Sequence, residues 1–242
     1  MQAQAIFRSP FFAISPLYVP ALLAGPEARA PMMARAPKLT AGQIGIFGVL
    51  GQNDWFADSD YSAIRADLKR ALADPSVKTI DLFIDSPGGS VLGLPETADA
   101  IHAANRQKPV RAFVTGIAAS AAYWLASQAS TVSLTPSGEV GSVGVLDLHA
   151  DISKALDVAG VKITAVTAGE HKTERAPFNA LSDDAKAHMQ TEVNRWYADF
   201  LSAIRRGRGA RVSADSNFGA GRMLSSGAAL AAGMVDFVGG IA

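Results

Sequence analysis

Ser120 is the residue whose type and setting best suit covalent chemistry. It lies in the run GIAASAAYW (116–124), where a predicted strand gives way to an alanine-rich predicted helix. Free N–H groups at a helix N-terminus favour developing negative charge, and the small neighbours let a substrate backbone lie close. The position therefore suits a nucleophile, although a serine that merely caps a packed helix has the same sequence pattern.

A second chemical signal is the run DSPGGSV (85–91), directly after a predicted buried strand. Its two glycines allow positive φ, so their N–H groups can point into a cleft at the carboxyl end of the sheet. Such a turn can cradle a phosphate or stabilise an oxyanion, and a tight turn without chemistry is the simpler alternative. The phosphate hypothesis is weak because neither Gly-x-Gly-x-x-Gly nor a Walker motif is present. The N–H groups of Gly89 and Ala121 are the expected oxyanion donors.

A nucleophilic serine needs a base, and two residues compete for that role. His149 follows Ser120 at moderate separation, whereas Lys172 lies in a loop after the strand predicted at 161–166. A lysine acts as a general base only where burial disfavours its charged form. Residue types and spacing leave both candidates open.

Strands and helices alternate along the chain, which indicates βαβ units, a mainly parallel sheet and an α/β fold. Residues 1–38, rich in proline and alanine, are expected to form an extended N-terminal arm with little regular structure, and residues 39–242 one domain. Ser182 is the expected N-cap of a long helix that reaches about Arg205. The predicted strands are 44–50, 79–85, 110–114, 131–134 and 161–166, and the other predicted helices are 61–72, 91–105 and 121–127.

Composition limits the possible partners of the 242-residue chain. The formal net charge is zero, which argues against bulk attraction to nucleic acid or to an anionic membrane. With no cysteine, the chain has no disulfide, thiol chemistry or cysteine metal site. Prolines interrupt the apolar stretch 6–23, so a cytosolic protein without a membrane anchor is expected, an export signal being the alternative. Four arginines (Arg205, Arg206, Arg208 and Arg211) are expected to form a solvated helix end instead of a nucleic-acid patch.

Four runs of the sequence together resemble the signal peptide peptidase A family. The runs 85–91 and 116–124 are followed, in the order and spacing of that family, by GEVGSVGV (138–145) and GRMLSSGAALAAGMVD (221–236). The resemblance covers about residues 43–240. Clp protease is similar in the Pro-Gly-Gly turn and the serine junction, but not in the later runs.

This resemblance implies a crotonase/Clp-protease-like fold of repeated β-β-α units and a serine endopeptidase with a Ser-Lys dyad. By analogy with the family, Ser120 is the nucleophile, Lys172 the base, and Ser142 orients the lysine. Gly89 and Ala121 supply the oxyanion hole. The family uses no cofactor or metal, and it gives no role to a histidine at the place of His149.

The N-terminal segment is most similar to short, soluble family members of tailed phages and prophages, which cleave scaffold or portal proteins inside the prohead. The resemblance thus implies a polypeptide substrate, a homo-oligomer, no nucleic acid, no stable membrane anchor, and a location in the host cytoplasm or prohead. Two alternatives stay open: a bacterial peptidase that degrades signal peptides, and a non-proteolytic crotonase-like protein that assists assembly or binds acyl groups.

Overall fold

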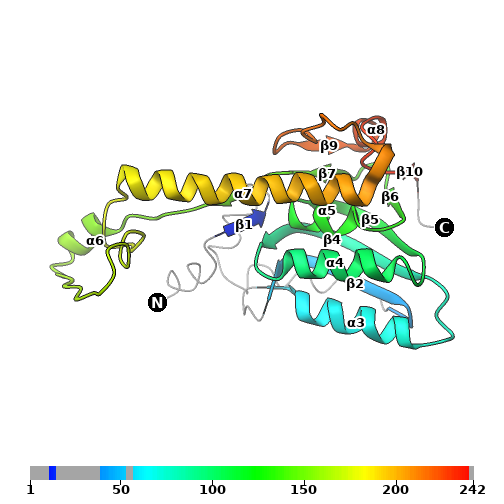
Figure 1. Ribbon diagram of the computed structural model, residues 1–242, viewed down its shortest axis with the longest axis horizontal. Coiled ribbons are helices and arrows are strands. Elements are labelled where there is room, and N and C mark those ends of the chain that lie inside the picture. Colours follow the sequence, from blue (N-terminus) through cyan, green and yellow to red (C-terminus); the bar gives the residue numbers. More distant parts are fainter. Residues whose placement is uncertain (1–10, 15–38, 53–56, 240–242) are drawn as a thin grey trace.

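The computed structural model describes residues 11–14 (backbone only), 39–52 and 57–239. Within these residues ten strands form one sheet that is flanked by helices (Figure 1). The strands are β1 Phe11–Ile14, β2 Gln43–Gly51, β3 Ser59–Asp60, β4 Ile80–Ser90, β5 Val110–Ala119, β6 Thr131–Leu134, β7 Glu139–Gly141, β8 Leu146–Asp147, β9 Met223–Ser225 and β10 Phe237–Val238. The helices are α3 Tyr61–Ala73, α4 Leu94–Ala104, α5 Ala121–Ala126, α6 Ser153–Val158, α7 Asp183–Arg208 and α8 Ser226–Ala231, with a 3-10 turn at Gly209–Arg211.

The centre of the sheet is parallel, as predicted. Strands β2, β4, β5, β6 and β10 pair in parallel in that spatial order. Alternate residues of β4, such as Ile80, Leu82 and Ile84, are fully buried beneath helices α3, α4 and α5. The prediction of a mixed α/β fold with a mainly parallel sheet is confirmed. The antiparallel pairings in this part of the chain are β1 with β4, β1 with β8, and β7 with β9.

Two central strands are longer than the sequence predicted. β4 continues through the glycine run to Ser90, and β5 continues to Ala119, each across a register irregularity. Both extensions exist because new neighbours pair with them: β2 and β1 with β4, and β7 with β5. The glycine run is thus part of the sheet, not a turn that leaves it.

The prediction of a strand at 161–166 is wrong. These residues have no regular secondary structure and are exposed, with Val166 at 95% of its full exposure. No strand in the described part of the chain lies beside them to complete a ladder. In a strand, the backbone N–H and C=O groups form hydrogen bonds with a neighbouring strand. An apolar, β-branched run that has no such neighbour therefore does not form a strand.

The long helix α7 begins where the sequence predicted, with the Ser182 hydroxyl accepting a hydrogen bond from the N–H of Ala185 at 3.1 Å. Its 26 residues correspond to roughly 39 Å of helix. The C-terminal half packs on α5 through stacked rings of Trp124 and Phe200, whose centroids are 4.7 Å apart. The N-terminal half continues past the sheet toward α6 (Figure 1).

The arginines at the end of α7 form the predicted solvated face only in part: Arg206 and Arg211 are exposed, whereas Arg208 is not. Arg208 is fully buried, and its guanidinium donates to both carboxylate oxygens of Asp236 and to the carbonyl of Gly233. Arg211 donates to the carbonyl of Ser130. Although burial raises the pKa of Asp236, hydrogen bonds from Arg208 and the N–H of Val132 lower it further, so its pKa lies below the usual value. These arginines therefore fasten the end of α7 to the start of β10.

Part of the predicted N-terminal arm belongs to the sheet. Residues 11–14 form β1, between β4 and β8, and the rest of the predicted arm lies outside the described residues. Among the described residues, no helix combines the length and the apolar character that a membrane crossing requires.

Candidate active site

Ser120 occupies a strained junction between β5 and α5. Its φ of 53° and ψ of −119° lie in a region that non-glycine residues rarely adopt. Backbone hydrogen bonds on both sides of Ser120 hold it in this conformation. The N–H of Ser120 donates to the carbonyl of Gly141 at 2.7 Å, and its own carbonyl accepts from the N–H of Trp124 at 3.0 Å. A serine on a sharp, strained strand-to-helix turn is the geometry that presents a nucleophile at the end of a sheet.

Glycine is favoured at two successive positions of β4, Gly88 and Gly89, for two different reasons. Gly88 has a φ of 95°, which favours glycine. A Cβ on Gly89 would lie 1.9 Å from the carbonyl oxygen of Leu50 in the neighbouring strand β2, so no side chain fits there. Ser86 stabilises the irregularity, because its hydroxyl donates to the carbonyl of Gly48 at 2.6 Å and accepts from the N–H of Gly88 at 3.1 Å.

Strand pairing brings this run and Ser120 to the same end of the sheet. Ser86 on β4 is paired with Ala118 on β5, and Gly88 and Ser120 each lie two residues beyond this last pair. Gly89 and Ala121 follow directly. Three of the residues predicted from sequence, the nucleophile and the two oxyanion donors, are therefore neighbours at the carboxyl end of the parallel sheet.

The run 141–144 surrounds Ser120 from the other side. The Ser120 hydroxyl donates to the carbonyl of Gly144 at 3.3 Å. Ser142, nearly buried, has a φ of 52°, and its N–H donates to the carbonyl of Arg222 at 2.8 Å. Because β7 pairs with β9, the two late runs noted in the sequence meet beside the first two. All four runs thus converge on one serine.

A cavity of about 400 Å³ is lined in part by Gly144, the residue whose carbonyl accepts the hydrogen bond from Ser120. It lies between the segment that follows β7 and the middle of α7, and its walls are mostly apolar. The lining residues are Ser142, Val143, Gly144, Val145, Leu146, Val193, Asn194, Tyr197, Ala220 and Gly221.

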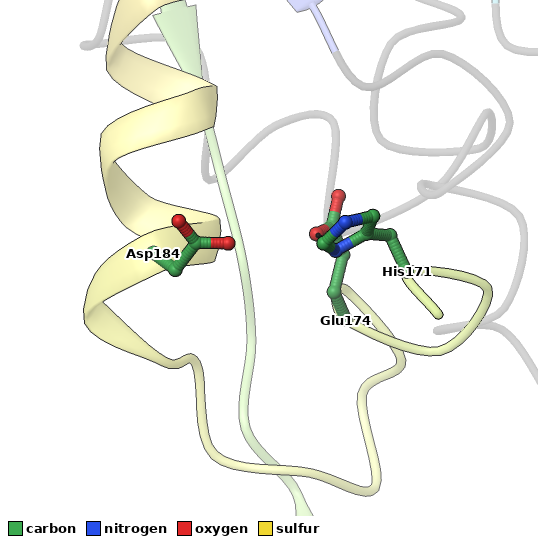
Figure 2. A group of neighbouring side chains, drawn as sticks. All are labelled: His171, Glu174 and Asp184. Carbon is green, nitrogen blue, oxygen red and sulfur yellow. Dashed lines mark ion pairs between the residues drawn. The ribbon is translucent and has the colours of Figure 1, made fainter. Parts of the chain in front are cut away.

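Lys172, the predicted base, is exposed in the segment that precedes α7. Its neighbour His171 lies against Asp184 in the first turn of α7 (Figure 2), whereas α5 packs near Phe200. The separation along α7 is on the order of 20 Å, longer than any lysine side chain. Figure 1 shows the same arrangement, with the segment that follows α6 beyond the sheet. Within one chain the structure does not bring Lys172 to Ser120.

Comparison with known proteins identifies the family. The sequence pattern of Peptidase family S49 matches residues 102–242, which is more than half of the chain. This chain belongs to Peptidase family S49. The Clp protease pattern matches residues 53–137, which hold the parallel strands β4 and β5 and the Ser120 junction, in agreement with the Clp-like fold expected from the sequence.

Relatives of this S49 chain include phage proteins. It is 35% identical over 164 residues to the head-tail preconnector protein GP5 of Enterobacteria phage P21, covering 68% of this chain and 33% of that protein. It is 37% identical over 134 residues to the capsid assembly protease C of Escherichia phage lambda, covering 55% and 30%. A putative protease of Methanocaldococcus jannaschii is 31% identical over 169 residues, covering 69% and 53%. The chain thus spans about a third of the phage relatives and about half of the archaeal one.

The rival base of this S49 chain, His149, is engaged elsewhere. Its Nε2 donates to the carbonyl of Asn179 at 3.1 Å, in the segment that also carries Lys172. The ring therefore fastens that segment to the chain after β8. The structure pairs Ser120 with a backbone carbonyl, not with this imidazole.

One group of side chains could ligate a divalent metal. His171, Glu174 and Asp184 each offer a ligand atom, and these atoms lie within 4.8 Å of one another (Figure 2). His171 and Asp184 are exposed, and His171 Nδ1 lies 3.1 Å from the Glu174 carboxylate. The contact between His171 and Glu174 lies within one loop and accounts for two members of the cluster without a metal.

Proposed function

We propose that this chain is a serine endopeptidase in which Ser120 attacks the scissile carbonyl carbon. The observation that carries the proposal is the strained Ser120 junction beside the glycine edge of β4, in a chain of a peptidase family. Strain at a functional residue persists only where its surroundings hold it, and here hydrogen bonds hold both sides of the residue.

The chemistry is acyl transfer in two steps. The neutral amine of Lys172 takes the hydroxyl proton of Ser120 as the oxygen attacks, and the N–H groups of Gly89 and Ala121 stabilise the oxyanion. The amine then delivers the proton to the leaving nitrogen, and an acyl-enzyme remains. Water, deprotonated by the same amine, hydrolyses it. In this scheme the Ser142 hydroxyl orients the lysine amine, and no cofactor or metal takes part.

The lysine of this dyad comes from a second copy of the chain. Two contacts fix its segment to the chain around β8, the hydrogen bond from the His149 ring to the carbonyl of Asn179 and an ion pair between Arg175 and Asp147. Lys172 itself is exposed in its own chain. A second copy that places this segment over Ser120 would complete the dyad and bury the amine, which is the condition for a lysine base.

The surface of the same segment supports such an assembly. Residues 148–166 expose an unusual number of apolar side chains, with Val158 at 86% and Val166 at 95% of full exposure. Water contact with so many large apolar groups is unfavourable, and patches of this kind mark protein interfaces. The other exposed apolar residues of the segment are Leu148, Ile152, Val161 and Ile163.

The substrates we propose are phage head proteins: scaffold, portal or capsid subunits, cleaved in the prohead within the host cytoplasm. Two relatives carry the names capsid assembly protease and head-tail preconnector protein. The mostly apolar cavity beside Ser142 and Gly144 suits a small or medium apolar substrate side chain next to the cleaved bond.

The experiment is activity-based labelling with a fluorophosphonate, read by mass spectrometry and paired with peptidase assays on phage head proteins. We expect the label on Ser120, and loss of labelling and cleavage in Ser120→Ala. Lys172→Ala should lose cleavage, whereas Lys162→Ala, which removes another exposed lysine of the same segment, should retain it. Unchanged proteolysis in Ser120→Ala, or equal effects of the two lysine substitutions, would contradict the proposal.

A further inference from the structure

Strand β1 occupies an unusual place in the sheet. Its backbone pairs antiparallel with β4 on one side, where Ala13 lies opposite Gly89, and with β8 on the other, where Phe12 lies opposite Leu146. The segment 11–14 is far in sequence from both strands. A short segment that inserts between two strands and bonds to each through its main chain is the geometry of strand addition, one of the recurring modes of peptide recognition.

The edge of β4 that β1 uses can be identified from the pairings. A strand has two edges, and β2 covers one edge of β4 as far as Gly89. β5 pairs with the other edge only as far as Ser86, opposite Ala118. β1 therefore pairs with Gly88–Ser90 along the edge that β5 leaves uncovered, just beyond the Ser86–Ala118 pair.

The second neighbour of β1 also comes from the active site. β8 begins at Leu146, two residues after Gly144, whose carbonyl accepts the hydroxyl hydrogen bond of Ser120. The two walls of the β1 groove are thus the glycine run that supplies an oxyanion donor and the run that contacts the nucleophile. Ser120 itself is fully buried in this structure.

We propose that the groove between β4 and β8 binds the substrate as an extended polypeptide strand, and that residues 11–14 of the chain itself fill it as an internal competitor. This inference rests on the proposed peptidase function and adds the binding mode and a means of control. The segment runs antiparallel to Gly88–Ser90, so a substrate in its place would donate to and accept from the same main-chain groups. A four-residue strand makes few such bonds, so a longer substrate segment can displace it.

Peptide binding tests the groove without catalysis. In a Ser120→Ala background, Ala13→Pro removes one ladder N–H and disfavours the strand whichever neighbour that N–H faces, whereas Ala13→Ser keeps it. The probe is a fluorescent peptide of residues 9–18 (SPFFAISPLY). We expect the proline variant to bind it about tenfold more tightly than the serine variant. Equal affinities would overturn the inference.

Hydrogen exchange tests the displacement of residues 11–14 in a chain whose segment is not mutated, so a folding defect of a variant cannot produce the result. In the Ser120→Ala chain with an unaltered segment, excess peptide should raise amide exchange in residues 11–14, while Gly89 and Leu146 stay protected by the incoming strand. Bound peptide with unchanged protection of 11–14 would place the peptide elsewhere and refute the groove.

Labelling kinetics separate this inference from the proposed function. In the chain with intact Ser120, Ala13→Pro should speed fluorophosphonate labelling about tenfold over Ala13→Ser. If neither variant is labelled, the peptidase proposal fails, while the two binding measurements still judge the groove. If both are labelled at the same rate, the segment does not control access and the inference fails.

Discussion

A mixture of two inactive variants should regain activity if the dyad forms between copies. The Ser120→Ala variant keeps Lys172 but has no nucleophile. The Lys172→Ala variant keeps Ser120 but has no base. Each working site needs Ser120 from one copy and Lys172 from another, because about 20 Å of helix α7 separates the two parts of one chain that carry them. Random mixing in equal amounts fills each position correctly half of the time, so about a quarter of the sites should work.

The assay is hydrolysis of a fluorogenic peptide after the two purified variants are dissociated, mixed and reassembled. Ser120→Ala mixed with Lys162→Ala is the matched control: the lysine is intact in every copy, so about half of the sites should work. Dilution below the assembly concentration should abolish the restored activity, because complementation needs contact between copies.

A mixture that stays as inactive as its parents, while the control mixture reaches half activity, would refute the reasoning. It would mean that serine and lysine meet within one chain after a rearrangement of the segment before α7, or that Lys172 is not the base.

Three further predictions concern single positions. Gly89→Ala should lower stability by about 1–3 kcal/mol and reduce activity, because its Cβ would overlap the Leu50 carbonyl; chemical denaturation and peptidase assays measure both effects, and a neutral result would contradict the steric argument. Asp236→Ala should cost about 3–5 kcal/mol in denaturation because it strands the buried charge of Arg208. Since the pKa of Asp236 is lowered by folding, its contribution is present above the ordinary carboxyl pKa and is lost as pH falls through the folded value; Asp236→Asn should flatten this acid dependence, and an unchanged slope would exclude that carboxyl as the cause. Ser142→Ala should lower kcat about tenfold and shift the pH–rate profile, with little change in thermal unfolding; a profile of unchanged shape would argue against its role on the lysine.

The sequence predicted best those features whose pattern is local. The apolar alternation around Leu82 and the cap at Ser182 determine their elements without reference to distant residues. The Ser120 junction could also be predicted, because small residues between a strand and a helix leave few other arrangements. These parts position Ser120, Gly89 and Ala121.

Features that depend on a distant partner could not be predicted from local pattern. The run 161–166 has the composition of a strand but no neighbour in the described part of the chain, and β1 is a strand only because β4 and β8 leave a gap for it. The local sequence predicts that Arg208 is solvated at a helix end. Its burial depends on Asp236, which lies 28 residues later in the sequence and accepts its hydrogen bond. The place of Lys172 follows from the direction in which α7 runs past the sheet, which no local pattern conveys.

Helix α7 has a consequence for how copies of the chain are spaced. One end is fastened to the sheet by buried arginine, and the other carries the segment with Lys172. A helix advances about 1.5 Å and turns about 100° per residue, so deleting one residue between Asp184 and Phe200 would swing that segment around the axis while hardly shortening the rod. In the proposed assembly, the number of residues in this stretch would set the angle between successive subunits, and only insertions of whole turns would preserve it.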